Sequence, residues 1–126
     1  ADRDGRAGGQ PPGVTPAAIP GSETAEWAEA VDKDGTYGNE ITIRSLDLLR
    51  GYEPISFMTR IAPTPLLMIV ADQDTQTPVA WQGEAFEMAG HPKKLVTLSG
   101  RHYDPYTLLL EESRQAALDW FQEHLK

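Results

Sequence analysis

The sequence contains no cysteine, no long apolar run and few basic residues, and each absence excludes a class of protein. Without Cys, the chain can form no disulfide, no Cys-ligated zinc site and no Cys nucleophile. No apolar run approaches the roughly 20 residues that cross a bilayer, so we expect no membrane span. The 19 Asp and Glu residues outnumber the 11 Lys and Arg residues, which argues against nucleic acid as a partner. The lack of disulfides fits a reducing compartment, and we expect a cytoplasmic protein.

The first half of the chain shows a change from Gly/Pro-rich to helical sequence. Residues 1–21 hold five Gly and four Pro, a composition that predicts an irregular linker or loop. Ser22 is suited to cap a helix that ends near residue 30, and Asn39 to cap a second helix over 40–50. Pro54 then opens a further turn. We therefore expect an irregular stretch over 1–21 and a mainly helical segment over 22–62.

The sequence pattern of the second half of the chain, residues 63–126, predicts alternating strands and helices. Residues 66–71 form a continuous apolar run, typical of a strand that is buried on both faces. A helix over 78–89, a second strand over 94–98 and a last helix over 108–125 follow. The expected core stripe of the last helix consists of Ala117, Trp120, Phe121 and Leu125. This order indicates an α/β fold with parallel strands, and two strands alone would be the end of a larger sheet.

Polar loops follow both predicted strands, where ligands bind in open α/β sheets. The first loop carries Asp72 and Asp74, and the second carries His102 and Asp104. Neighbouring parallel strands would bring these loops together, and an Asp can then fix the tautomer of a His. Two alternatives stay open at this point. The four side chains could be ordinary loop residues that cap turns, or they could form a carboxylate/His metal site.

Three stretches of the second half resemble the C-terminal part of α/β-hydrolase-fold enzymes. Residues 65–78 resemble the late strand and acid loop, residues 93–102 the final strand with its Gly-x-His loop, and residues 117–121 the terminal helix. Residues 39–62 resemble the stretch beside the cap region in dienelactone-hydrolase-like members. The resemblance implies that His102 is the base of a catalytic triad and that Asp74, rather than Asp72, is its acid.

The sequence departs from that family in one large respect, because it contains no Gly-x-Ser-x-Gly motif and no oxyanion-hole segment. We therefore expect the nucleophile on a preceding segment or a separate chain, and no activity from this chain alone. The expected substrate is an ester, lactone or related acyl compound, with no cofactor and no metal. Candidate substrate contacts are Phe57, Met58, Tyr103 and Tyr106.

A reading from a different class of function is a non-catalytic interaction module, or a degenerate hydrolase relative, that pairs with another chain. A homo-oligomer is possible, and a stable homodimer of this chain without an N-terminal half would support the interaction module. The hydrolase reading predicts an Asp–His pair with catalytic geometry, whereas the interaction reading requires no such pair.

Overall fold

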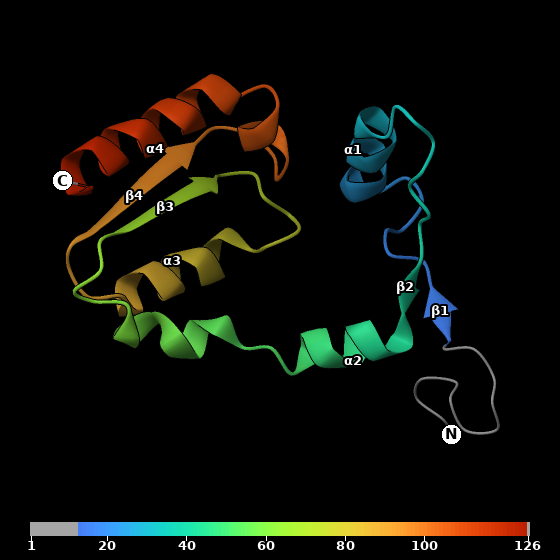
Figure 1. Cartoon of the computed structure of the whole chain (residues 1–126), viewed down its shortest axis with the longest axis horizontal. Coiled ribbons are helices and arrows are strands. Elements are labelled where there is room, and N and C mark those ends of the chain that lie inside the picture. Colours follow the sequence, from blue (N-terminus) through green and yellow to red (C-terminus); the bar gives the residue numbers. More distant parts are fainter. Residues whose placement is uncertain (1–12, 126) are drawn as a thin grey trace. The chain divides into compact units, whose positions relative to one another are not determined.

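The computed structural model describes residues 13–125, which form two compact units that meet in sequence between Glu53 and Pro54 (Figure 1). Most of the predicted irregular stretch, residues 1–12, lies outside the described residues. None of the helices in residues 13–125 is long and apolar enough to cross a membrane.

The first unit contains a short antiparallel strand pair and a capped helix. Helix α1 spans Glu23–Val31, and the Ser22 hydroxyl accepts the Ala25 amide as the sequence predicts. Strand β1, Val14–Thr15, pairs with strand β2, Ile41–Thr42. Residues 14–15 therefore belong to a strand rather than to an irregular stretch, because β2 supplies partners for their backbone groups.

The second helix of this unit, α2, begins later than the sequence predicts. It spans Ile43–Arg50, and Thr42 rather than Asn39 is its N-cap, accepting the Ser45 amide. The Asn39 side chain instead accepts the Ala18 amide at 2.7 Å and donates to the Ala18 carbonyl at 2.8 Å. Asn39 was the wrong cap because this pair of bonds occupies its side chain and β2 intervenes before the helix.

The second unit contains the parallel strands that the sequence predicts. After the 3-10 helix η1, Pro54–Arg60, the chain forms β3, Leu66–Ala71, then α3, Val79–Met88, and then β4, Lys93–Leu98. The 3-10 helix η2, Asp104–Tyr106, precedes the last helix, α4, Leu110–His124. The α/β fold class is confirmed: β3 and β4 pair in parallel, from Leu66 opposite Lys93 to Ala71 opposite Leu98.

Helices α3 and α4 lie on the two sides of the β3–β4 pair (Figure 1). The buried hydrophobic residues of this unit are Val70, Ala71, Ala89, Leu98 and Trp120. The predicted core stripe of α4 is wrong at its far end, because Phe121 is 54% exposed and Leu125 is 74% exposed. A sheet of two strands presents too little surface to cover a 15-residue helix.

Strand β3 has one paired edge and one open edge within the described residues. Its only sheet neighbour there is β4. Its first four residues are apolar yet only half-buried, although the strand has a helix on each side. An open apolar edge of this kind is a surface on which a further strand can pair.

Candidate active site

The acid-bearing and His-bearing loops are held side by side because backbone pairing continues past the ends of the two strands. The Asp72 amide donates to the Leu98 carbonyl at 2.9 Å, and the Gln73 amide donates to the Gly100 carbonyl at 3.0 Å. The Asp72 carboxylate in turn accepts the Gly100 amide at 3.1 Å. Asp72 thus connects the two loops both through its backbone amide and through its side chain.

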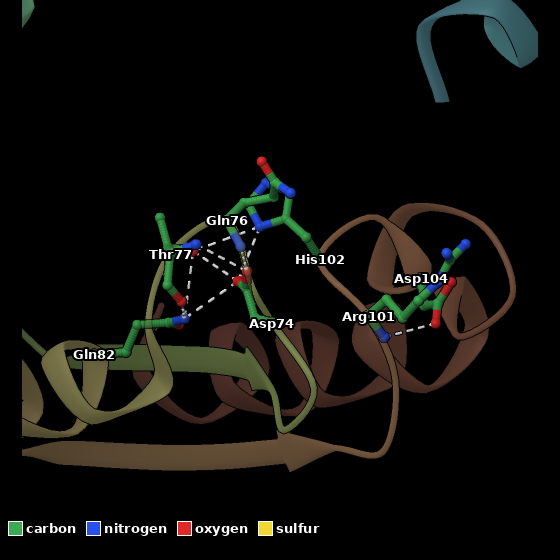
Figure 2. Close-up of polar contacts among 7 residues, drawn as sticks. All are labelled: Asp74, Gln76, Thr77, Gln82, Arg101, His102 and Asp104. Atoms are coloured by element: carbon green, nitrogen blue, oxygen red, sulfur yellow. Dashed lines mark hydrogen bonds and ion pairs between the residues drawn. The ribbon is translucent and has the colours of Figure 1, made fainter. Parts of the chain in front are cut away.

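The Asp74 carboxylate is the centre of the polar cluster at this end of the sheet, and it accepts five hydrogen bonds (Figure 2). Its Oδ1 accepts the Gln76 and Thr77 amides at 2.8 and 2.9 Å. Its Oδ2 accepts the Thr77 hydroxyl at 2.6 Å and the Gln82 amide nitrogen at 3.2 Å. The fifth donor is His102 Nδ1, at 2.9 Å from Oδ2.

These contacts fix the charge of Asp74 and the tautomer of His102. Burial would by itself raise the pKa of Asp74, whose side chain is 6% exposed, but the hydrogen bonds from Thr77, His102 and the Gln76 amide outweigh it. The net effect lowers the pKa of Asp74 from 3.8 to about 2. An ionised carboxylate can only accept, so Nδ1 of His102 carries a proton, and in the neutral imidazole Nε2 is then the nitrogen with a lone pair.

The loop that carries His102 is built around Gly100 and Asp104. Asp104 Oδ2 accepts the Arg101 amide at 2.7 Å, and the Asp104 carbonyl accepts the Thr107 and Leu109 amides (Figure 2 shows the first of these contacts). A Cβ at position 100 would lie 2.7 Å from Leu109 Cδ1, 2.8 Å from Asp104 Oδ2 and 3.0 Å from Asp104 Cβ, so these two side chains would have to shift to admit it. The absence of a Cβ at Gly100 therefore lets the side chains of Asp104 and Leu109 pack closely against the backbone just before His102.

The four acidic and basic candidates do not form one cluster. Asp74 and His102 lie together, whereas Asp72 is bonded to the Gly100 amide and Asp104 to the Arg101 amide. Over residues 13–125, no group of three or more His, Asp or Glu side chains is placed to hold a metal ion. The carboxylates of Asp72 and Asp104 serve to fold the loops.

A cavity of about 460 Å³ opens beside the Asp–His pair. It is lined by Asp74, Thr77, Gln82 and His102, by residues of β3, and by Tyr106, Ser113 and Arg114 among others. Of the predicted substrate contacts, only Tyr106 lines it.

The other three predicted contacts lie elsewhere in the second unit. The Tyr103 ring packs edge-on against the His102 ring with centroids 4.6 Å apart. Phe57 and Met58 belong to η1, and the Phe57 side chain is 57% exposed. Neither η1 residue lines the cavity described here.

Sequence reasoning missed Thr77 and Gln82 as members of the site. Thr77 lies three residues after Asp74, a spacing at which an Asp side chain commonly caps the following backbone. That signal could have predicted the backbone contact. The hydroxyl contact of Thr77 and the reach of Gln82 from the first turn of α3 depend on tertiary geometry, which the sequence pattern does not contain.

Comparison with solved structures relates this arrangement to a known fold. The α/β hydrolase GrgF from Penicillium sp. sh18 matches 98% of this chain with a TM-score of 0.79 and 25% identity. The structure of DcsB in complex with its substrate analogue matches 98% of the chain with a TM-score of 0.72 and 20% identity. The fold is that of α/β hydrolases.

Sequence comparison adds one similar curated protein. A polyketide transferase of Gibberella fujikuroi is 30% identical over 82 residues, which are 64% of this chain. No family model matches the sequence. The chain spans 46% and 47% of the two solved structures and 26% of the transferase, so each similarity concerns only part of those proteins.

Proposed function

We propose that this chain supplies the acid and the base of a triad-type enzyme that cleaves an ester, lactone or related acyl bond. The observation that carries the proposal is the 2.9 Å contact between Asp74 Oδ2 and His102 Nδ1 at the carboxyl ends of adjacent parallel strands. His102 is the catalytic base and Asp74 is its orienting acid. A dienelactone-hydrolase-like subtype and a cytoplasmic location stay predictions.

The mechanism follows from the fixed tautomer of the imidazole. Nδ1–H donates to Asp74, so Nε2 of His102 takes the proton of the attacking hydroxyl as the acyl bond is attacked. The imidazolium that forms is stabilised by the ionised Asp74 carboxylate. The same Nε2 proton then passes to the leaving group. Water, activated by His102 in the second half of the cycle, releases the acyl group.

The nucleophile and the oxyanion donors belong to a further segment or chain in this proposal. The Ser residues of this sequence, Ser22, Ser45, Ser56, Ser99 and Ser113, have no Gly-x-Ser-x-Gly context. The open edge of β3 supports this location for the nucleophile, because a strand paired there would lie next to the strand that leads into the Asp74 loop. A small acyl substrate is then bound between this chain and that segment.

Acyl transfer is a second candidate outcome of the same chemistry. It is favoured by the similarity to a protein named a polyketide transferase, over 82 residues. A triad transfers the acyl group to an alcohol or amine instead of water when the acceptor occupies the water site. The two outcomes share Asp74 and His102 and differ in the acceptor.

The test is activity of the assembled enzyme, meaning this chain together with the segment that provides the nucleophile, on a 4-nitrophenyl ester. His102→Ala and Asp74→Asn should each lower kcat about 10³–10⁴-fold, because the base or its tautomer is lost. The matched control Asp72→Asn should cost at most about tenfold, since among residues 13–125 the Asp72 carboxylate bonds the Gly100 amide and no other group.

The same assay distinguishes hydrolysis from acyl transfer and can refute the proposed roles of His102 and Asp74. An added alcohol or amine should divert product from the free acid to the acyl adduct if the enzyme is a transferase. Undiminished activity in His102→Ala would overturn the proposed function. A severe loss in Asp72→Asn with a mild loss in Asp74→Asn would reverse the assignment of the acid.

A further inference from the structure

We propose that Thr77 and Gln82 are positioning residues that direct the Oδ2 atom of Asp74 toward His102 and limit the basicity of the Asp74 carboxylate. This inference rests on the proposed function of the Asp–His pair. Neither residue touches the reacting atoms in this proposal. Both act through Asp74, and their side chains lie beside its carboxylate in Figure 2.

The two oxygens of Asp74 have different partners, and this difference separates a folding role from a site role. Oδ1 accepts only backbone amides, those of Gln76 and Thr77, and these bonds are sufficient to close the turn after β3. Oδ2 accepts only side-chain donors, from Thr77, Gln82 and His102. The donors on Oδ2 come from the turn, from α3 and from the loop after β4, so they link three parts of the second unit at one atom.

The orientation of the Gln82 amide follows from its neighbours. Its Nε2 lies 2.8 Å from the Thr77 carbonyl and 3.2 Å from Asp74 Oδ2, both of which are acceptors. Only the NH₂ group can satisfy two acceptors, and it has one hydrogen for each. Gln82 therefore connects the backbone of the turn to the carboxylate and restricts rotation of the Asp74 side chain.

The Thr77 hydroxyl is shared between acid and base. It donates to Asp74 Oδ2 at 2.6 Å and lies 3.4 Å from His102 Nδ1. Because its hydrogen is donated to the carboxylate, the hydroxyl oxygen can only accept from Nδ1. Thr77 thus supports the Nδ1–H tautomer from a second direction, while Asp74 provides the main acceptor at 2.9 Å.

Donors on Oδ2 also weaken the carboxylate as a partner for the imidazolium. Each hydrogen bond to a carboxylate spreads its negative charge and stabilises its ionised form. The proton between Asp74 and His102 therefore stays on Nδ1, and the imidazolium is stabilised less than it would be by a bare carboxylate. Removal of a donor should strengthen the Asp74–His102 bond and at the same time loosen its geometry.

The test uses Thr77→Val and Gln82→Met in the assembled enzyme, with two readouts. We expect kcat to fall about 3- to 30-fold with KM unchanged. The acidic limb of the pH profile should move upward by about half to one pH unit. The Nδ1 proton of His102 should move downfield in its NMR resonance. Thr77→Ser, which keeps the hydroxyl, should restore all three values.

Matched controls make the outcomes decisive. Thr75→Val is the same exchange in the same loop and should leave kcat, the pH profile and the resonance unchanged. Lower kcat in Thr77→Val and Gln82→Met with an unmoved limb and resonance would overturn the proposal, as would unaltered kinetics. An active His102→Ala enzyme would instead overturn the proposed function. In the proteins that keep His102, the Nδ1 resonance would still report on the Thr77 and Gln82 contacts.

Discussion

The low pKa of Asp74 predicts a specific loss of stability in acid. Its folded pKa is about 2, against 3.8 for the unconstrained side chain. A carboxylate whose pKa is depressed by folding stabilises the native state above its unfolded pKa, and this contribution is lost as the pH falls through the folded value. At 1.36 kcal/mol per pKa unit, the contribution is roughly 2 kcal/mol. Three of the hydrogen bonds that lower the pKa are exposed to solvent, so screening reduces the contribution and roughly 2 kcal/mol is its upper value.

The assay is the free energy of unfolding by urea, measured from pH 2 to pH 7 at constant ionic strength for the wild type and Asp74→Asn. Asn cannot titrate, so the difference between the two proteins isolates this carboxylate. The difference should be flat above about pH 5 and should shrink by up to roughly 2 kcal/mol between pH 4 and pH 2.

The same measurement in a His102→Ala background tests which contacts are responsible. Four of the five hydrogen bonds to Asp74 come from Gln76, Thr77 and Gln82 and do not involve His102. Most of the acid-sensitive difference should therefore persist without the imidazole. A difference that is independent of pH, or one that grows as the pH falls, would refute the reasoning.

Three further predictions concern the rest of the second unit. Lys93→Met should lower the free energy of unfolding by about 1–3 kcal/mol in urea titrations, because the Lys93 ammonium donates to the Phe86 and Glu87 carbonyls at the end of α3. Gly100→Ala should cost about 1–3 kcal/mol by the same measurement and lower kcat, because its Cβ would collide with Asp104; unchanged values would contradict the close approach. The isolated 126-residue chain should hydrolyse a 4-nitrophenyl ester no faster than the protein-free rate, and burst kinetics would contradict an external nucleophile.

The sequence predicted the second unit better than the first, for physical reasons that particular residues illustrate. The apolar run that became β3 and the polar loops after both strands follow from local composition, and these suffice to bring Asp74 near His102. The start of α2 was predicted wrongly because the Asn39 side chain is bonded to the backbone of Ala18, 21 residues away. No local pattern distinguishes such an Asn from a helix cap.

Helical periodicity also did not predict how deeply each apolar residue of α4 is buried. Helical spacing places Trp120 and Phe121 on one apolar stripe of α4, yet only Trp120 is buried. Periodicity identifies the residues that favour burial, whereas actual burial depends on how much surface the neighbouring elements provide. For α4 that surface is a sheet of two strands.

The Asp–His geometry depends on a short part of the chain, and this bears on how a divided triad could be assembled. The backbone bonds from Asp72 to Leu98 and from Gln73 to Gly100 continue the β3–β4 register directly into the two loops. The donors that orient Asp74 all lie between residues 76 and 102. Asp74 and His102 are thus aligned by contacts inside the second unit. In the enzyme that we propose, a nucleophile added beside the open edge of β3 would meet a base whose tautomer is already set.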